Sequence, residues 1–380
     1  MSIPFNIPPS INDSKKYVLE SLDSGALSGG GPFTKKCEEW LVGKFPKTSG
    51  VLLTTSCTHA LEVSGILLNL SGDDEVIVPS FTFVSTALAY HMHGAKVRFC
   101  DIREDTLNID ETLLEKAITK NTKVIVVVHY AGVSCEMDTI MAIAKKYNIL
   151  VVEDNAHGIF GKYKGAPLGT IGDFATLSFH ATKNISCGEG GALLVNRKKL
   201  LKRAEIIIEK GTNRAQFING QIDKYSWVDK GSSYIMSDLL AALLYGQLEH
   251  SKEIQLKRRT IWERYFGELS NWALSNQVLL PFVPEYCEQS HHMFYMLFPE
   301  ESTRNKFINY MADHGISAVF HYLPLESSEM GLNIALSDQT DCPVAVNISG
   351  RIVRIPMFFG LNFSDQSRII ETIINYTVEG

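Results

Sequence analysis

Between residues 51 and 195 the chain alternates short, continuously apolar runs with stretches whose apolar residues recur at helical spacing. Strands that are apolar on both sides are typical of a parallel sheet that helices cover on both faces. The pattern therefore predicts a three-layer α/β/α domain. The expected strands are residues 51–54, 75–78, 96–100, 123–129, 149–154, 174–179 and 191–195, and the expected helices are 58–70, 87–91 and 139–146.

The pattern changes after about residue 250. A long amphipathic helix is expected there, followed by shorter elements of both kinds, which is typical of a small α+β domain. A chain of 380 residues is also longer than one ordinary domain. We therefore predict a large α/β domain at residues 1–250 and a small α+β domain at 251–380. The expected C-terminal elements are helices at 251–269, 303–314 and 364–376 and strands at 292–297 and 315–319.

The composition excludes several classes of function. The chain is 45% hydrophobic and has a net charge of −6, which gives no electrostatic footprint for nucleic acid or an anionic membrane surface. No apolar run approaches the roughly 20 residues of a membrane span, and the N-terminal segment lacks the features of a signal peptide. We therefore expect a soluble protein that binds neither nucleic acid nor membrane.

The cysteines and histidines give no metal site. The seven cysteines are scattered and form no C-x-x-C pair, which argues against zinc and against a disulfide framework and favours a reducing, cytoplasmic compartment. His91 and His93 would face different ways on a helix, and His291 and His292 have no acidic or cysteine partner at ligand spacing. We therefore expect no bound metal.

Two polar or aromatic groups follow the first two predicted strands, at the edge where α/β sheets bind ligands. Cys57 and Thr58 open a helix after the first strand, where free backbone N–H groups suit a phosphate. Taken alone, ordinary capping of the helix by Ser or Thr is the favoured explanation of that sequence. Phe83 follows the second strand and suits stacking on a flat ring, although a phenylalanine there is more often part of the core.

Two charged residues follow later strands. Asp154 ends a very apolar strand, where its carboxylate would either pair with a cationic ring nitrogen or cap the next turn. Lys183 lies between a strand and the glycine-rich residues 188–191. Desolvation at the rim of the sheet would lower its pKa and make it a usable amine, whereas the alternative is a solvated surface lysine. Together, a carboxylate, an aromatic ring, a phosphate-ready helix start and a lysine fit pyridoxal phosphate.

These motifs resemble the DegT/DnrJ/EryC1/StrS family of sugar-nucleotide aminotransferases, which have the type I fold of aspartate aminotransferase and use pyridoxal phosphate. The resemblance covers nearly the whole chain, because several independent motifs occur in the right order. They are residues 28–31, 54–61, 79–86, 151–157, 178–191, 236–239 and 320–322. Residues 129–132, 210–214 and 231–234 most resemble enzymes that aminate a TDP-linked 4-oxo-6-deoxyhexose.

The resemblance implies a role for each residue that matches the family motifs. Lys183 resembles the lysine that forms a Schiff base with the cofactor, and relatives with histidine at that position are dehydratases, so Lys183 indicates transamination. Asp154 resembles the partner of the pyridine nitrogen, and Phe83 the residue stacked on the ring. The implied phosphate contacts are the N–H groups of Cys57 and Thr58 and the hydroxyl of Ser178.

Two positions depart from the family pattern. His157 replaces the glutamine that contacts the ring hydroxyl in many relatives, and histidine can still donate that hydrogen bond. Ser233 replaces an asparagine that reaches the phosphate across a dimer interface. The resemblance thus implies a homodimer with active sites at the subunit interface. For the nucleotide sugar the candidates are Lys210 and Arg214, and His321 is either part of the sugar pocket or a structural histidine.

The expected reaction converts dTDP-4-keto-6-deoxy-D-glucose and L-glutamate to dTDP-4-amino-4,6-dideoxy-D-galactose and 2-oxoglutarate. Such a product would be a precursor of surface polysaccharides such as O-antigen lipopolysaccharide or enterobacterial common antigen. The alternatives are the gluco epimer, a 3-keto or UDP-sugar aminotransferase of the same family, and a lyase or desulfurase on the same fold. A regulatory protein that kept the fold and lost turnover is the alternative outside enzymes.

Overall fold

The computed structural model describes residues 2–218 and 220–378. A seven-stranded sheet lies at its centre, with strand order β1-β9-β8-β5-β4-β2-β3. The strands are β1 (Gly50–Thr54), β2 (Glu75–Pro79), β3 (Lys96–Cys100), β4 (Thr122–Val128), β5 (Leu150–Asp154), β8 (Phe174–Ser178) and β9 (Gly191–Val195). Two small sheets contain β6 (Lys162–Tyr163), β7 (Ala166–Pro167) and β10 (Cys287–Glu288), and β11 (Phe294–Leu297) and β12 (Ile352–Ile355).

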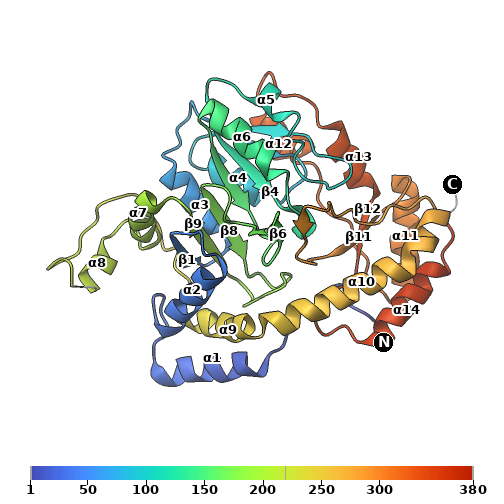
Figure 1. The fold of residues 1–380 in the computed structure, drawn as a ribbon, viewed down its shortest axis with the longest axis horizontal. Helices are drawn as coiled ribbons and strands as arrows, with labels where there is room; N and C mark the ends of the chain where they lie inside the picture. The colour runs from blue at the N-terminus through green and yellow to red at the C-terminus, as the bar shows by residue number, and fades with distance from the viewer. Residues whose placement is uncertain (1, 219, 379–380) are drawn as a thin grey trace.

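The helices surround the sheet and continue into the C-terminal part (Figure 1). Those before residue 250 are α1 (Asn12–Ser24), α2 (Pro32–Lys44), α3 (Cys57–Leu67), α4 (Ser85–His91), α5 (Leu114–Ala117), α6 (Met137–Tyr147), α7 (Lys198–Ile208), α8 (Arg214–Ile218) and α9 (Asp238–Glu249), with the 3-10 turn η1 (Tyr130–Gly132). The later ones are α10 (Ser251–Ser275), α11 (Glu301–Asp313), η2 (Leu325–Ser327), α12 (Glu329–Ile334), α13 (Pro343–Arg351) and α14 (Phe363–Ile374).

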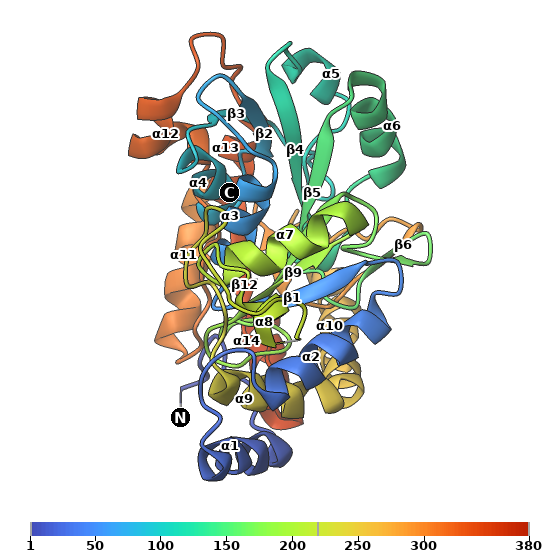
Figure 2. The same ribbon diagram turned by 90° about the vertical axis from the view of Figure 1, so that its left-hand side faces the viewer.

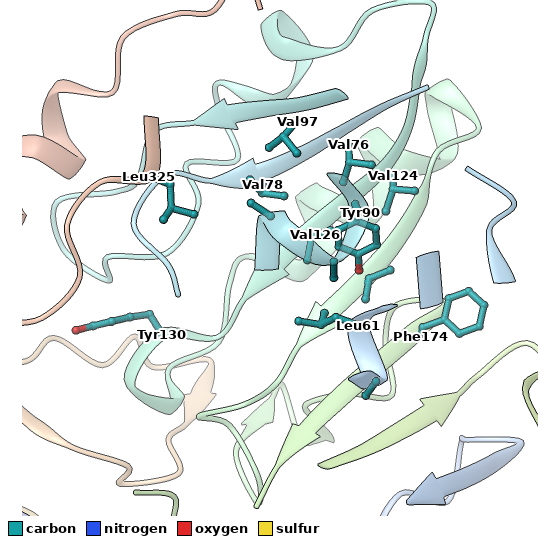
Figure 3. Packing of buried hydrophobic residues seen from close by; sticks show 14 of the residues in the cluster. Leu61, Val76, Val78, Tyr90, Val97, Val124, Val126, Tyr130, Phe174 and Leu325 are labelled. Atoms are coloured by element: carbon teal, nitrogen blue, oxygen red, sulfur yellow. The ribbon is translucent and has the colours of Figure 1, made fainter. Parts of the chain in front are cut away.

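Alternation along the strands places apolar side chains on both faces of the sheet. In β4, Val124 and Val126 face the core beneath α3 and α4, whereas Ile125 and Val127 face the core beneath α6. Figure 2 shows α3 and α4 on one side of these strands and α6 on the other, and Figure 3 shows Tyr90 of α4 packing beside the valines. The predicted three-layer domain is therefore confirmed.

Strand β9 runs antiparallel to both of its neighbours, β1 and β8, so the expectation of a wholly parallel sheet is wrong. The physical reason lies in the connection between β8 and β9. A parallel neighbour needs a crossover long enough to hold a helix, whereas residues 179–190 form an irregular loop that turns back. Gly191 is required at the start of β9, because a Cβ there would lie 2.4 Å from the backbone N of Cys57.

A separate apolar cluster lies in the C-terminal part, between α10, α11, α14 and the β11–β12 pair. Helix α10 leads from α9 to this cluster (Figure 1). Ile3 from the N-terminal segment also belongs to it, while α13 packs against the large sheet and receives two caps at its N-terminus from the carboxylate of Asp101. The boundary predicted at residue 250 falls between α9 and α10 and stays a prediction.

The predicted strands and helices are confirmed, with one exception and small shifts at their ends. Helix α3 ends at Leu67 rather than at residue 70, because Asn69 adopts a positive φ of 51°. The strand predicted at residues 315–319 is wrong. Ile316 bridges to Ile3 and Val319 bridges to Arg354, so the segment pairs with two different partners at single positions and forms no continuous ladder.

Glu153 of β5 ties the strand to the loop that precedes β8. Its fully buried carboxylate accepts hydrogen bonds from the backbone N–H groups of Gly169, Ile171 and Gly172 at 2.7, 2.8 and 2.6 Å, and from Nε2 of His129 at 2.9 Å. Replacing Glu153 with glutamine puts an amide N–H₂ against these donors. We expect a loss of about 3 kcal/mol in the free energy of unfolding.

This loss is measured as a shift of the urea midpoint. The matched control is Glu263→Gln, which removes an exposed ion pair with Arg259 on α10 and should cost less than about 1 kcal/mol. An unchanged midpoint for Glu153→Gln would show that the buried carboxylate does not hold the loop.

Candidate functional site

The carboxyl ends of β1, β5 and β8 open into one cavity of about 800 Å³. Ligands bind at this edge in α/β sheets because the loops there diverge from the strands. Seven of the predicted site residues line the cavity together with His321. The seven are Cys57, Thr58, Phe83, Asp154, His157, Ser178 and Lys183.

Lys183 lies in the loop between β8 and β9 and extends into the cavity. Burial lowers the pKa of its amine to about 8, although the carboxylate of Asp154 acts in the opposite direction. About a tenth of the amine is therefore neutral at pH 7, far more than for an ordinary lysine, and this fraction is available as a nucleophile or base. The alternative of a solvated surface lysine is excluded by this position.

Asp154 ends β5 at the base of the cavity. Burial raises the pKa of its carboxyl group. A cation placed beside the carboxylate would lower this pKa again. The hydroxyl of Thr86 donates to Oδ2 at 2.7 Å, and the N–H of Ala156 donates to Oδ1 at 3.2 Å. Asp154 therefore caps the following turn and also lines the cavity with its carboxylate. The predicted pairing with a ring nitrogen stays a prediction.

The N-terminus of α3 forms a neutral cradle of N–H and O–H groups. Ser56 caps the helix by accepting the N–H of His59, so the capping interpretation is correct for Ser56. The hydroxyl of Thr58 is hydrogen-bonded to that of Ser85 at 2.7 Å, and the thiol of Cys57 donates to Thr176. Burial raises the pKa of Cys57, and the charge of Asp154 acts in the same direction, so Cys57 stays a thiol and the helix end itself carries no negative charge against an anion.

Aromatic rings form the upper walls of the cavity. Phe81 is core, whereas Phe83 is 56% exposed and faces the cavity, which the sequence pattern could not decide. His157 stacks on His292 with ring centroids 4.3 Å apart and an angle of 18° between the planes. Burial lowers the pKa of His157, and its Nδ1 is buried without a hydrogen-bond partner. This unsatisfied polar atom indicates that a ligand completes the site.

His321 also lines the cavity, and its Nδ1 is hydrogen-bonded to the hydroxyl of Tyr130 at 2.6 Å. Burial lowers the pKa of the ring, so it is neutral. The three other predicted residues lie elsewhere, around Glu209. Lys210 and Arg214 approach its carboxylate at 3.8 and 3.4 Å, and Ser233 bridges to its backbone. Their predicted contacts with phosphate or nucleotide are not formed within this single subunit and stay predictions.

Thr86 and His292 are among the residues that contact the predicted site residues and that sequence reasoning missed. Thr86 stands one helical turn after Phe83, so a helix beginning at the strand end could have indicated that both reach the same cavity. From the sequence, His292 is considered only as a candidate metal ligand. Its Nδ1 is hydrogen-bonded to Oδ1 of Asn184 at 2.8 Å, which fixes the ring that stacks on His157.

The family model for DegT/DnrJ/EryC1/StrS aminotransferases matches residues 9–374. The chain belongs to this family. Among the proteins similar to it are the spore coat polysaccharide biosynthesis protein SpsC of Bacillus subtilis, at 31% identity over 98% of this chain and 96% of SpsC. Another is the GDP-perosamine synthase of Escherichia coli O157:H7, at 30% identity over 98% of this chain and 97% of the synthase.

Solved structures of family members agree with the fold. Spr1654 of Streptococcus pneumoniae, described as a sugar aminotransferase, superposes in its PLP form with a TM-score of 0.89 at 29% identity, over 98% of both chains. The sugar aminotransferase CalS13 of Micromonospora echinospora superposes with a TM-score of 0.87 at 25% identity, over 98% of this chain and 99% of CalS13. This DegT-family chain therefore has the type I fold and is a PLP-dependent sugar aminotransferase.

The residues of the cavity fit pyridoxal phosphate. Asp154 offers a carboxylate for a protonated ring nitrogen, Lys183 an amine for the aldehyde, and the start of α3 free N–H groups for the phosphate. The unpaired Nδ1 of His157 is a further group for the ring substituents. Among residues 2–218 and 220–378 no cluster of histidine, cysteine or acidic side chains is placed to hold a metal ion, and no helix there is long and apolar enough to cross a membrane.

The lowered pKa of Lys183 makes cofactor loading depend on pH. Below a pH of about 8 the free amine is protonated, and above it the amine is neutral and can attack an aldehyde. We expect the rate at which the cofactor-free protein takes up pyridoxal phosphate to rise with pH and to level off above about 8. Absorbance of the loaded protein measures this rate.

The control is Nα-acetyl-lysine, whose amine titrates near the ordinary value of 10.5. If loading of the protein followed the same pH dependence as this model amine, the pKa of Lys183 would not be lowered.

Proposed function

We propose that the enzyme transfers the amino group of L-glutamate to carbon 4 of dTDP-4-keto-6-deoxy-D-glucose. The products are 2-oxoglutarate and dTDP-4-amino-4,6-dideoxy-D-galactose. The observation that carries the aminotransferase chemistry is the meeting of Lys183 and Asp154 in one cavity. The choice of sugar is supported by the resemblance of residues 129–132, 210–214 and 231–234 to enzymes that aminate this type of ketosugar.

Each residue of the cavity has a proposed role in this reaction. When bound, pyridoxal phosphate supplies an electron-withdrawing pyridinium ring. Asp154 accepts a hydrogen bond from the ring nitrogen and keeps it protonated. Lys183 would hold the cofactor through its amine and would move a proton to and from the α-carbon of the donor, a task that suits a pKa near the working pH.

The remaining residues bind and orient. The N–H groups of Cys57 and Thr58 and the hydroxyl of Ser178 hold the phosphate, because this helix end carries a partial positive charge. Phe83 stacks on the ring, and its exposed face in the cavity leaves room for that contact. His157 donates to the ring hydroxyl, and His321 lines the sugar pocket.

The proposal includes a homodimer. Lys210, Arg214 and Ser233 do not line the cavity of their own subunit, which is expected if they serve the site of a partner. The segment around α8 projects from the body (Figure 1) and exposes large apolar side chains, among them Trp227, which is 81% exposed. Light scattering is expected to give twice the mass of the chain. We also propose a cytoplasmic location, because the seven cysteines are scattered along the chain and form no disulfide framework.

The test of the function is incubation of the purified enzyme with L-glutamate and dTDP-4-keto-6-deoxy-D-glucose, with the product identified by NMR. An axial amine at carbon 4 supports the galacto product, and an equatorial amine assigns the gluco epimer. Parallel incubations with GDP- and UDP-linked ketosugars test the carrier. If only one of those is aminated, the dTDP proposal is wrong while the aminotransferase assignment stands. The name of SpsC supports a product that enters a polysaccharide.

A further inference from the structure

The ring of His157 needs support from its surroundings to keep one orientation. Its Nδ1 is buried without a hydrogen-bond partner, and its Nε2 lies at the long distance of 3.4 Å from the hydroxyl of Tyr322. Rotation about the last side-chain torsion of a histidine is broad, so hydrogen bonds or packing must fix the plane of the ring. The hydrogen bonds of His157 are too few for this, and the rings packed against it must supply the rest.

The ring packed most closely against His157 is that of His292. The two centroids are 4.3 Å apart and the planes differ by 18°. The rings of Tyr130, His321 and Tyr322 lie farther from His157, with centroids at 5.8, 6.1 and 6.4 Å. Burial lowers the pKa of both histidines, so two neutral rings lie face to face without charge repulsion. His292 therefore makes the contact that sets the plane of His157.

His292 is itself held by Asn184, the residue that follows Lys183. Nδ2 of Asn184 donates to the carbonyl oxygen of Ser290 at 2.8 Å. A carbonyl oxygen can only accept, so this hydrogen bond turns Oδ1 of the amide toward His292. Because Oδ1 also can only accept, its bond of 2.8 Å to His292 requires a proton on Nδ1 of that ring. Asn184 thus determines both the tautomer and the orientation of His292.

Helix α10 holds the backbone on either side of this ring. Arg258 of α10 is buried, and it donates from Nε to the carbonyl oxygen of His291 at 3.0 Å and from Nη2 to that of His292. A charge removed from water is costly, and these two hydrogen bonds offset part of that cost. The hydroxyl of Ser290 donates to the carbonyl oxygen of His157 at 2.5 Å. The same short segment therefore supports both the backbone and the ring of His157.

We propose that His292 is a positioning residue for the cofactor, which holds His157 in the orientation in which it meets the hydroxyl of the pyridine ring. Asn184 links this pair of rings to the loop that carries Lys183. One connected set of contacts would then place the group that meets the ring hydroxyl and the amine that meets the aldehyde. This inference rests on the proposed contact between His157 and the cofactor, and it does not depend on which sugar is aminated.

Two substitutions of His292 separate the effect of its ring from that of its hydrogen bond. His292→Asn can keep the bond to Asn184 through its amide N–H₂ but loses the flat ring. His292→Phe keeps a flat ring against His157 and loses the bond. The quantity measured is the dissociation constant of pyridoxamine phosphate from the cofactor-free protein, by calorimetry. Pyridoxamine phosphate has no aldehyde to react with Lys183, so this constant reports the non-covalent contacts alone.

For His292→Asn we expect the dissociation constant to rise roughly tenfold, the cost of a hydrogen bond between His157 and the cofactor that is no longer aligned. His292→Phe should stay within about threefold of the wild type, because the stacked ring is kept. In a His157→Ala background, His292→Asn should have no further effect, because no ring remains to be oriented.

The matched control is His291→Asn. His291 is the neighbour of His292 but does not line the cavity. Its φ of 51° is a conformation that asparagine tolerates, so the substitution adds no backbone strain. The dissociation constant of this variant should equal that of the wild type, and melting temperatures of the cofactor-free variants show which of them are folded.

A tenfold loss for His292→Asn that disappears in the His157→Ala background supports the proposal. The same loss in both backgrounds overturns it, because His292 would then act without His157. An unchanged constant for His292→Asn, or a loss in His292→Phe as large as in His292→Asn, overturns it as well. If His157→Ala binds pyridoxamine phosphate like the wild type, the inference falls together with the proposed contact of His157, while the aminotransferase activity stands. If His292→Asn does not fold, His292→Leu, which fills the space without a flat ring, replaces it in the same comparisons.

Discussion

Replacing Lys183 with alanine is expected to lower multiple-turnover transamination by roughly 10⁴-fold or more. The variant loses both the amine that joins the aldehyde and the base that moves the α-proton of the donor. Burial lowers the pKa of this amine to about 8, and no other lysine lines the cavity among the described residues. The measurement is kcat with saturating L-glutamate and ketosugar.

A chemical readout accompanies this measurement. Borohydride reduction of the loaded wild-type enzyme should add the mass of the cofactor to the peptide that contains Lys183, and the alanine variant should show no such peptide. The control is Lys199→Ala, an exposed lysine at the start of α7, which should keep full activity. Full turnover by the Lys183 variant would remove the basis of the proposed mechanism.

Asp154→Asn should lower kcat by roughly 10³-fold, because removing one charge of a buried pair costs about 3–5 kcal/mol. The amide is similar in size to the carboxylate and can still be reached by Thr86 and Ala156, so the fold should be kept. What the variant loses is the negative charge that keeps a ring nitrogen protonated. The absorbance spectrum of the loaded enzyme should therefore change together with kcat.

Two comparison variants define the effect of Asp154→Asn. Thr86→Val removes the hydrogen bond to Oδ2 and leaves the charge, so its loss should be much smaller, roughly tenfold. Asp138→Asn changes an exposed aspartate paired with Lys164 and should have no effect. If Asp154→Asn kept the activity and the spectrum of the wild type, the carboxylate would serve only as the cap of the turn at Ala156.

Sequence reasoning located the sheet because its signal is local. Continuous apolar runs are short enough to read one at a time, and the strands observed at the centre fall on the predicted segments. The direction of β9 was mispredicted because it depends on whether the loop before it turns back or crosses over, which is a property of the loop rather than of the strand. The strand predicted at residues 315–319 is not formed for a related reason. The two positions that pair there, Ile316 and Val319, bridge to residues that are far away in the sequence, Ile3 and Arg354.

The residues of the candidate site also fall into those that a local sequence signal identified and those that it did not. Lys183, Asp154 and Phe83 were identified because each follows a recognisable strand, and the family motifs gave them roles. Thr86 and His292 were missed because their importance comes only from the side chains beside them, Asp154 and His157.

Periodicity and short motifs depend only on neighbours along the chain, so they were enough to predict the layered α/β architecture, the family and the residues at the ends of the strands. The tertiary structure was needed to establish which of these residues line one cavity and how burial lowers the pKa of Lys183 and raises that of Asp154. The physical reason is that desolvation and charge pairing act through space, between residues that lie up to about 200 positions apart in the sequence.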